Sequence, residues 1–466
     1  QSEIIAFQMI TMAFARSRGI TSFLIQFLRS VLVVAGCMIA GTTYGQEPLI
    51  RDSVANHNQD FHFQFTTVTQ RKSSIRSPYS GPRSLLPGAE TASTLTATIF
   101  YGRPLWKNAA VYFNPEIAGG SGISGAQGIG GFTNGEAFRV GEPAPSIYVA
   151  RLFFQQTIAL SDEMVDVGLG ANDVHKLKPA RYLDIVAGKF SVADYFDRNS
   201  YSHDPRSQFL NWSLMSTGAW DYPANVRGYT WGGVLELGLK NYSIRAAATM
   251  LPLEANGNDL NRKISKAYGT MIELERRFRV SDRNGVIRIL TFYNRANMGD
   301  YRLAVSSSNG TPDVVSTREY GRDKYGFSVN TELELSRYVG AFARASWNDG
   351  NHETWAFTEI DRSVSGGLDF DGAAWKRRED RIGLAIAMNG ISVPHRDYLK
   401  AGGSGFILGD GTLNYGREMI AEIYYRANLF SEAFYLTPDL QAVINPGYNR
   451  SRGPAFFAAL RVHFEF

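Results

Sequence analysis

The feature that most constrains the fold of this chain is a recurring alternation of apolar and polar side chains over about ten residues. The last segment shows it best: Phe456, Ala458, Leu460, Val462, Phe464 and Phe466 alternate with residues that include Arg461, His463 and Glu465. Successive side chains of a β-strand point to opposite faces, so each such segment predicts a strand with one apolar and one polar face.

Sixteen segments of this kind can be placed after residue 60. They are 61–69, 92–101, 109–117, 146–160, 181–190, 229–239, 242–251, 269–278, 286–296, 324–335, 339–348, 353–370, 380–390, 417–428, 434–444 and 456–466. An even number predicts that both ends of the barrel sequence lie on the same, periplasmic side. Segment 353–370 is the least regular of them, because Gly366 and Gly367 interrupt it.

The connections between these segments also alternate in length. Short connections at 104–108, 240–241 and 337–338 contrast with long stretches rich in Gly, Ser, Pro and Asn, which are 70–90, 118–145, 191–228, 252–268, 297–323 and 392–416. The apolar faces are closed by aromatic residues, and the opposite faces carry Glu and Arg, as in a barrel that faces lipid outside and water inside. We therefore predict an all-β fold over 61–466: a transmembrane antiparallel barrel of about sixteen strands, with short periplasmic turns and long extracellular loops.

The first 45 residues have the pattern of a secretory signal peptide. Arg16 and Arg18 precede an apolar run over 20–40, and small residues follow it. A membrane anchor is disfavoured because Arg29 divides the run and leaves a piece of about ten residues, too short to span. A lipoprotein cleavage box ending at Cys37 is disfavoured because apolar residues continue after it.

We thus expect a signal peptide at 1–45 and a periplasmic N-terminal segment at 46–60. Met12 is a plausible start, in which case 1–11 would not be translated. Export of a barrel of this kind predicts the outer membrane of a Gram-negative bacterium, with its lipid, its lipopolysaccharide and the barrel-assembly machinery as partners.

Composition and motifs exclude several function classes. Lys and Arg number 48 against 44 Asp and Glu, a balance that argues against a nucleic-acid binder. Cys37 is the single cysteine, so no disulfide framework or multi-cysteine metal site is expected. No Gly-x-Ser-x-Gly elbow or HExxH motif occurs, and the Gly-rich run 119–131 lacks the Gly-Lys-Ser/Thr of a phosphate loop. We expect no enzyme activity, cofactor or metal.

An aromatic and polar stretch, 208–228, lies in the third long loop. One interpretation is an extracellular flap with buried aromatic residues. The other is a loop that folds inward and narrows the pore, where Trp212, Trp220 and Tyr222 would stack on sugar C–H faces while Asp221 and Arg227 bond hydroxyl groups.

Alternation along the predicted strands supplies further candidates for the pore lining. These are Glu236, Arg245, Glu332, Glu334, Arg344, Glu422 and Arg426. The alternative is that most of these side chains pair with neighbouring strands and hold the wall rigid. At the chain end, Phe466 is expected to act as the insertion signal of the last strand.

Several motifs resemble those of the OprB-type carbohydrate-selective porins. They are found at 76–82, 112–116, 131–136, 199–206, 219–223, 227–232, 409–411, 413–416 and 445–449, so that the resemblance covers essentially all of 61–466. It implies a sixteen-stranded outer-membrane barrel through which sugars diffuse, with a constriction lined by Arg and Glu.

The function expected from the sequence is passive, substrate-selective diffusion of mono- and small oligosaccharides through a water-filled lumen. A general or anion-preferring porin is the main alternative. A barrel enzyme and an adhesive or structural barrel are the others. The sequence leaves open whether the porin is a monomer or a homotrimer.

Overall fold

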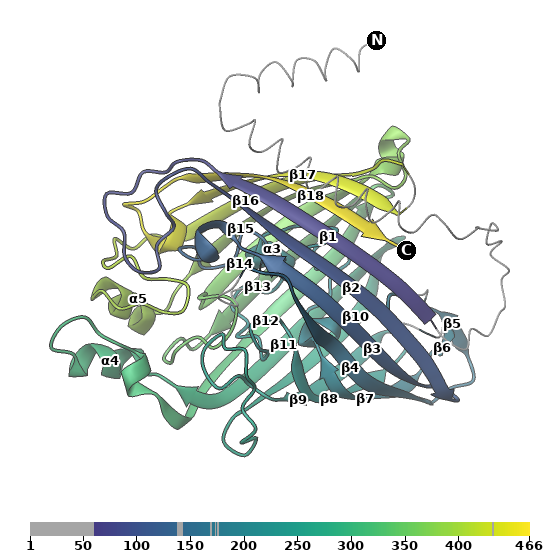
Figure 1. Cartoon of the computed structure of the whole chain (residues 1–466). Coiled ribbons are helices and arrows are strands. Elements are labelled where there is room, and N and C mark those ends of the chain that lie inside the picture. Colours follow the sequence, from purple (N-terminus) through teal and green to yellow (C-terminus); the bar gives the residue numbers. More distant parts are fainter. Residues whose placement is uncertain (1–59, 138–142, 168–169, 173, 175–176, 431–432) are drawn as a thin grey trace, which may run out of the picture. The chain divides into compact units, whose positions relative to one another are not determined.

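The computed structural model describes residues 60–137, 143–167, 170–172, 174, 177–430 and 433–466. In this part of the chain sixteen strands close into one antiparallel barrel, and each strand pairs with its neighbours in sequence (Figure 1). The predicted signal peptide, and all of the predicted segment 46–60 except Asp60, lie outside the described residues.

The barrel strands are β1 (Asp60–Lys72), β2 (Glu90–Trp106), β3 (Ala109–Gly120), β4 (Ser146–Ala159), β7 (Tyr182–Phe190), β8 (Thr230–Gly238), β9 (Tyr242–Thr249), β10 (Tyr268–Val280), β11 (Arg283–Met298), β12 (Glu319–Ser336), β13 (Val339–Asn348), β14 (Arg362–Asp371), β15 (Arg381–Gly390), β16 (Glu418–Asn428), β17 (Phe434–Ile444) and β18 (Ala455–Glu465). Two short strands, β5 (Met164–Asp166) and β6 (Leu177–Pro179), form a separate hairpin between β4 and β7.

Helices are few and lie in the connections. They are α3 (Trp212–Met215), α4 (Tyr301–Ser307) and α5 (Val393–Lys400), with 3-10 turns at Ile123–Gly125, Val192–Asp194, Val315–Thr317, Gly372–Trp375 and Pro446–Tyr448. Among the described residues, no helix combines the length and the apolar character needed to cross a membrane.

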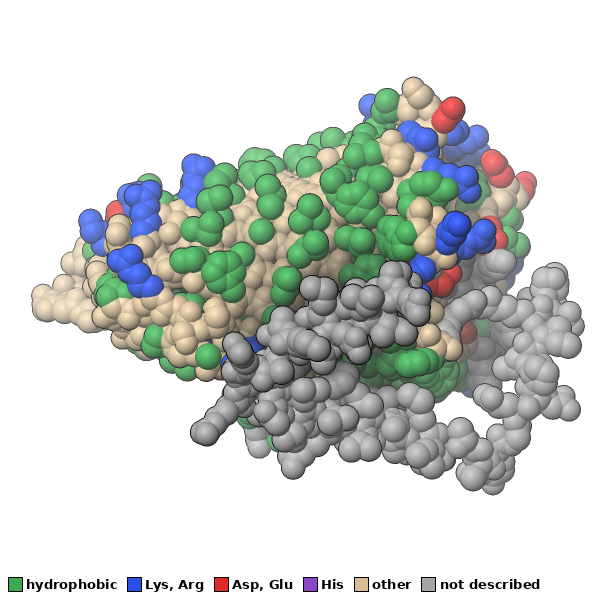
Figure 2. Space-filling model, turned by 90° about the horizontal axis from the view of Figure 1, so that it is seen from above, with side chains coloured by type: hydrophobic (Ala, Val, Ile, Leu, Met, Phe, Trp, Pro, Cys, Tyr) green, Lys and Arg blue, Asp and Glu red, His purple; other side chains and the backbone are tan. Residues whose placement is uncertain are grey.

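The barrel carries its apolar side chains on the outside. Leu235, Ile272 and Ile386 are 52%, 56% and 65% exposed, whereas Glu236 and Glu422 on the inner faces are 5% and 1% exposed. Hydrophobic side chains spread over the middle of the visible wall, and Lys and Arg gather toward its two ends (Figure 2). This arrangement is the inverse of a water-soluble protein and fits a wall surrounded by lipid.

The two ends of the barrel differ in the length of their connections. One end, called here the long-loop end, carries the segments 73–89, 121–145, 191–229, 250–267, 299–318, 349–361, 391–417 and 445–454. The opposite, short-turn end carries the other connections and the C-terminus, while α4 and α5 lie at the long-loop end (Figure 1).

Two details of the predicted topology are wrong. Strand β14 begins at Arg362, so 353–361 is a loop. Its aromatic residues are buried, and Trp355 donates from Nε1 to the Pro252 carbonyl at 3.0 Å. The segment therefore contains aromatic residues like those of a strand, although it is a loop. The connection 160–181 is long although it lies at the short-turn end, because the β5–β6 hairpin continues beyond β4 and β7.

A buried ionic cluster joins the loops of the long-loop end. His395 of α5 is fully buried, and its Nδ1 lies 3.0 Å from Asp361 Oδ2 while its Nε2 lies 3.6 Å from Glu359 Oε1. Its ring stacks on Tyr301 of α4 at 4.4 Å, and Lys324 Nζ lies 3.6 Å from Asp361 Oδ1. Burial lowers the pKa of His395, but the Asp361 carboxylate and the hydrogen bonds to Asp361 and Glu359 raise it by more, to about 9.

The pKa of His395 predicts a pH-dependent attachment of α5. The pKa of His395 is higher in the folded protein than its ordinary value of 6.5, so protonated His395 stabilises the cluster fully below pH 6.5. This stabilisation is lost as the pH rises from 6.5 through about 9. Limited proteolysis of 391–417 in the purified barrel should therefore accelerate between pH 6 and pH 10. His395→Gln should be cut quickly at both pH values. Equal cutting rates for wild type at pH 6 and pH 10 would contradict the prediction.

Closure of the barrel between its first and last strands predicts the effect of shortening the chain. Phe466 N donates to the Phe63 carbonyl at 3.1 Å, Phe63 N donates to the Phe466 carbonyl at 2.9 Å, and the two rings lie 5.5 Å apart. Deleting Phe466 removes two hydrogen bonds of about 0.5–1.5 kcal/mol each at the seam between β1 and β18. We expect a several-fold loss of heat-modifiable barrel in the outer membrane. Phe430→Ala, at an exposed position of the same end, is the control and should insert normally.

The loop lengths predict the orientation in the membrane. A protease-cleavable tag at the exposed Gly310, in the connection 299–318, should be cut on intact cells. A tag at Lys240–Asn241, in the turn between β8 and β9, should be protected until the outer membrane is opened. The reverse pattern would mean that the short-turn end faces outward.

Candidate pore constriction

The connection between β7 and β8, residues 191–229, lies inside the barrel and is called here the inner loop. It bonds to the opposite wall: Leu210 N and Asn211 N donate to the Glu422 carboxylate of β16 at 2.5 and 2.9 Å. Arg461 of β18 donates from Nη1 to the carbonyl oxygens of Pro205 and Gln208 at 2.7 and 2.6 Å. The inner loop therefore crosses the lumen and is not an extracellular flap.

Arg344 of β13 anchors the middle of the inner loop. Its Nε lies 3.1 Å from Asp197 Oδ1, and its other nitrogens donate to the carbonyls of Leu214 and Ser202 at 2.9 and 2.5 Å. Burial raises the pKa of Asp197, but Arg344 and hydrogen bonds from Thr217 lower it by more, so the carboxylate stays ionised. The Arg344–Asp197 pair is shielded from water, and Arg344 also donates hydrogen bonds to carbonyl groups of the inner loop. The pair therefore fixes the path of the inner loop.

Two further long-loop segments fill the lumen beside the inner loop. The Thr133 carbonyl of segment 121–137 accepts from Gln70 of β1 and from Gln441 of β17, each at 2.8 Å. Phe357 of segment 349–361 stacks on Trp212 of the inner loop, with ring centroids 4.7 Å apart and planes 4° apart. These segments therefore contact the barrel wall at β1 and β17 and pack against the inner loop.

An open cavity of about 640 Å³ remains between the inner loop and the walls on the other side of the barrel. Its lining comes from β1, β2, β4, β7 and β8, from the inner loop, from the β4–β7 connection and from the segments 121–137 and 349–361.

Arginine side chains are fixed around this cavity by carboxylates and aromatic rings. Arg151 of β4 forms a two-pronged pair with Asp194, with nitrogen–oxygen distances of 2.7 and 2.6 Å. Arg206 Nη2 lies 2.9 Å from Glu116 Oε2, and Arg206 Nε lies 3.2 Å from Glu136 Oε1. These pairs hold planar guanidinium groups in fixed orientations at the cavity wall.

Aromatic rings complete the lining. They are Phe100, Phe153, Tyr182, Tyr195, Trp212, Tyr222, Tyr229 and Phe357. Arg227 of the inner loop lies with its guanidinium carbon 4.1 Å from the centre of the Tyr148 ring and donates from Nη2 to Ser146 Oγ at 2.8 Å. The cavity thus presents apolar ring faces between hydrogen-bonding charged groups.

Of the residues predicted from the sequence, Trp212, Tyr222, Arg227 and Glu236 line the cavity. Trp220 and Asp221 are 2% exposed each and do not appear among the lining residues. Asp221 instead accepts hydrogen bonds from the backbone N–H groups of Trp355 and Ala356 at 2.8 and 3.0 Å, which attaches the inner loop to segment 349–361.

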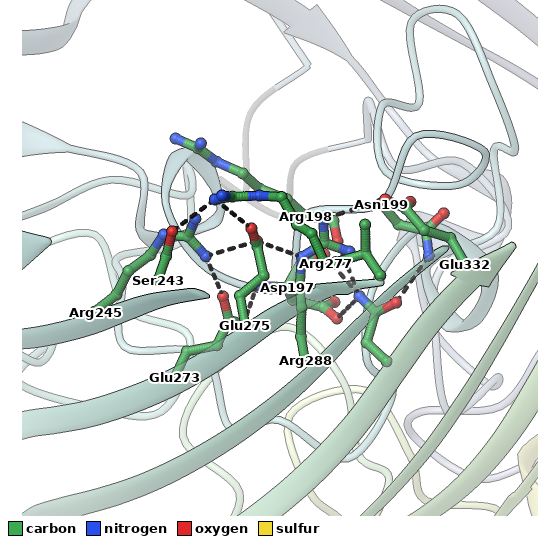
Figure 3. Close-up of polar contacts among 12 residues, drawn as sticks. Asp197, Arg198, Asn199, Ser243, Arg245, Glu273, Glu275, Arg277, Arg288 and Glu332 are labelled. Carbon is green, nitrogen blue, oxygen red and sulfur yellow. Dashed lines mark hydrogen bonds and ion pairs between the residues drawn. The ribbon is translucent and has the colours of Figure 1, made fainter. Parts of the chain in front are cut away.

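Several predicted wall residues form a continuous ionic belt across β8–β12. Figure 3 shows the members of this belt that lie on β9–β12. Arg245 contacts Glu236, Glu273 and Glu275 at 2.8–3.1 Å. Arg288 joins Glu275 at 2.9 Å to Glu332 at 3.2 Å. Arg245 and Glu332 therefore pair with neighbouring strands, as the alternative interpretation held, and Glu236 belongs both to the belt and to the cavity.

The remaining predicted wall residues have other local partners. Arg344 and Glu422 hold the inner loop, as described above. Glu334 accepts from Asn284 N at 3.0 Å next to the short turn between β10 and β11. Arg426 lies over the Tyr435 ring at 3.7 Å. None of these four lines the described cavity.

Several residues that line the cavity were not predicted as pore-lining residues from the sequence, among them Arg151, Asp194, Arg198, Arg206 and Tyr229. Arg151 was missed because β4 contains a bulge: Asn114 of β3 opposes Arg151, and the next residue of β3 opposes Val149. The extra residue reverses the alternation along β4, so a strict period of two places Arg151 on the wrong face. The signal for Arg206 was its place in the motif 199–206, whose role the sequence alone did not define.

No three or more His, Cys, Asp and Glu residues in the described part of the chain are grouped so that they could hold a metal ion. The chemistry that the lining offers is hydrogen bonding from fixed charged pairs and stacking on aromatic faces.

Comparison with one solved structure, that of Pseudomonas putida OprB, agrees with this architecture. The chain is similar to the structure of Pseudomonas putida OprB at high pH, with a TM-score of 0.66 and 16% identity over 88% of this chain and 94% of that one. It also matches the outer membrane channel DcaP of Acinetobacter baumannii, with a TM-score of 0.48 and 9% identity over 88% of this chain and 97% of that one.

A search of the curated proteins finds no sequence match. The model of the carbohydrate-selective porin family OprB matches residues 103–466. With the closed sixteen-stranded barrel, this match places the protein in the outer membrane of Gram-negative bacteria as a channel. The chain belongs to the OprB family of carbohydrate-selective porins.

Proposed function

We propose that this porin passes neutral, hydroxylated solutes, namely mono- and small oligosaccharides, by passive diffusion through the cavity beside the inner loop. The observation that carries the proposal is the lining itself, in which aromatic faces lie between charged groups of both signs. A volume of about 640 Å³ lies within the roughly 300–1,000 Å³ typical of small-molecule sites.

The charges of the described lining residues balance. The cationic residues are Arg151, Lys178, Arg198, Arg206 and Arg227, and the anionic ones are Glu136, Asp184, Asp194, Asp204 and Glu236, five of each sign. His203 adds no charge at pH 7, because burial lowers its pKa. A described lining without net charge favours neither anions nor cations strongly, which disfavours the alternative of an anion-preferring porin.

The recognition chemistry follows from the geometry of the lining. Sugar rings have apolar C–H faces, which pack on rings such as those of Trp212, Tyr222 and Phe357. Their vicinal hydroxyl groups can accept from a guanidinium and donate to a carboxylate at the same time, as the Arg151–Asp194 and Arg206–Glu136 pairs allow. Weak, repeated contacts of this kind let a solute both enter and leave.

The proposal predicts different effects for two arginine substitutions that the sequence alone does not separate. Arg227 lines the cavity, whereas Arg426 lies under Tyr435 away from it. Arg227→Ala should change the rate of liposome swelling with glucose or a disaccharide several-fold and should shift ion selectivity toward cations, because a lining cation is lost. Arg426→Ala removes the same charge and should leave both properties near wild type.

Both variants should be compared at equal amounts of heat-modifiable barrel. If both substitutions change sugar flux and selectivity equally, or if neither does, the solute path does not run along the inner loop at Arg227.

A further inference from the structure

Several described residues of the β4–β7 connection, which spans 160–181, line the cavity beside the inner loop. We propose that this segment forms a second constriction and specificity-determining site for hydroxylated solutes, in series with the inner loop. The preference for such solutes rests on the function proposed above, whereas the constriction itself follows from the position of the segment.

The base of the segment extends the barrel wall beyond the membrane-spanning strands. Leu160 N donates to the Arg181 carbonyl at 2.9 Å, and Ala180 N donates to the Glu163 carbonyl at 2.8 Å, so β5 and β6 continue the pairing of β4 with β7. Figure 1 shows this hairpin at the short-turn end.

The described residues between β5 and β6 contact the inner face of the barrel. Asn172 Oδ1 accepts from Asn114 Nδ2 of β3 at 2.9 Å, and Asn114 is fully buried on the lumen side. Val174 packs against Gly102 of β2 so closely that a Cβ at position 102 would lie 2.5 Å from Val174 Cγ1. The segment is thus fixed against the wall on the side where the cavity lies.

The same segment supplies polar groups to the cavity. Lys178 Nζ lies 2.5 Å from Asp184 Oδ2 and 3.6 Å from the centre of the Tyr182 ring. The Tyr182 hydroxyl donates to Glu236 Oε1 at 2.9 Å, which connects this group to the ionic belt. An ion pair beside an aromatic face repeats, at the short-turn end, the chemistry of the arginine pairs at the inner loop.

Four residues of the segment line the cavity together with the inner loop: Val167, Ala171, Asn172 and Lys178. A separate crevice of about 40 Å³ lies between the segment and the wall at Tyr112 and Thr157. A space of this size holds water molecules but no sugar. Under this proposal, a solute that leaves the cavity toward the short-turn end passes Asn172 and Lys178.

The test is a shortened variant in which 162–179 is replaced by Asn-Gly. The pairing of β4 with β7, which runs from Ala159 with Tyr182 to Leu152 with Lys189, stays unchanged. Single-channel conductance in salt is measured first, because it does not depend on any sugar. We expect the conductance to rise by roughly 1.5-fold or more when the constriction is removed. Interruptions of the current by added glucose or maltose should become more frequent only when the sugar is added from the short-turn side.

Asn172→Ala provides a second variant that keeps the whole segment and removes its bond to Asn114. It should raise the conductance in the same direction by a smaller factor. The matched control is Asp162→Ala, an exposed position of the same segment outside the cavity lining, which should behave as wild type.

Unchanged conductance in both the shortened variant and Asn172→Ala, with normal heat-modifiability, would overturn the proposed constriction. A rise in conductance would support the constriction even if sugars interrupt the current in neither the wild type nor the variants. The absence of such interruptions would contradict the proposed sugar preference of the inner loop and of the β4–β7 connection.

Discussion

The structure depends on one constraint: within hydrocarbon every backbone N–H and C=O group must be paired inside the protein. A closed sheet satisfies it, and the seam between β1 and β18 is where closure is completed, with consecutive pairs from Gln64 with Glu465 to Lys72 with Phe457. Once the outer face must be apolar, the charges of the strands can only point inward. The inner polarity of this barrel is therefore a consequence of its closure in lipid.

The inward-pointing charged side chains then need ion-pair or hydrogen-bond partners away from bulk water. They are found in three kinds of surroundings. Across β8–β12 they pair with one another in the belt around Arg245 and Arg288. On the opposite wall Arg344, Glu422 and Arg461 bond the backbone and side chains of the inner loop. On β4 and along the inner loop they stay at the edge of an open cavity, where a solute can reach them.

Most of the strand architecture could be predicted from the sequence, because a strand between lipid and water needs a period of two along its whole length. The errors arise where other forces act. Segment 353–361 carries Trp355 and Phe357 because these side chains are buried among loops, and Arg151 changes face because of a bulge. Alternation shows which side chains point inward, as for Arg245 and Glu422, but it cannot show which inward positions a loop will cover. That information lies in contacts between residues far apart in the chain, such as Asp197 with Arg344.

The central claim is that solutes pass on one side of the lumen, between the inner loop and the wall of β2, β4, β7 and β8. Single cysteines at two inward positions in a Cys37→Ser background test it directly: Gln155→Cys on the cavity wall and Ser365→Cys on the wall covered by loops. A small charged thiol reagent should react with Gln155→Cys and reduce single-channel conductance, and should leave Ser365→Cys unmodified and fully conducting. Equal modification and equal block at both positions would contradict the one-sided path.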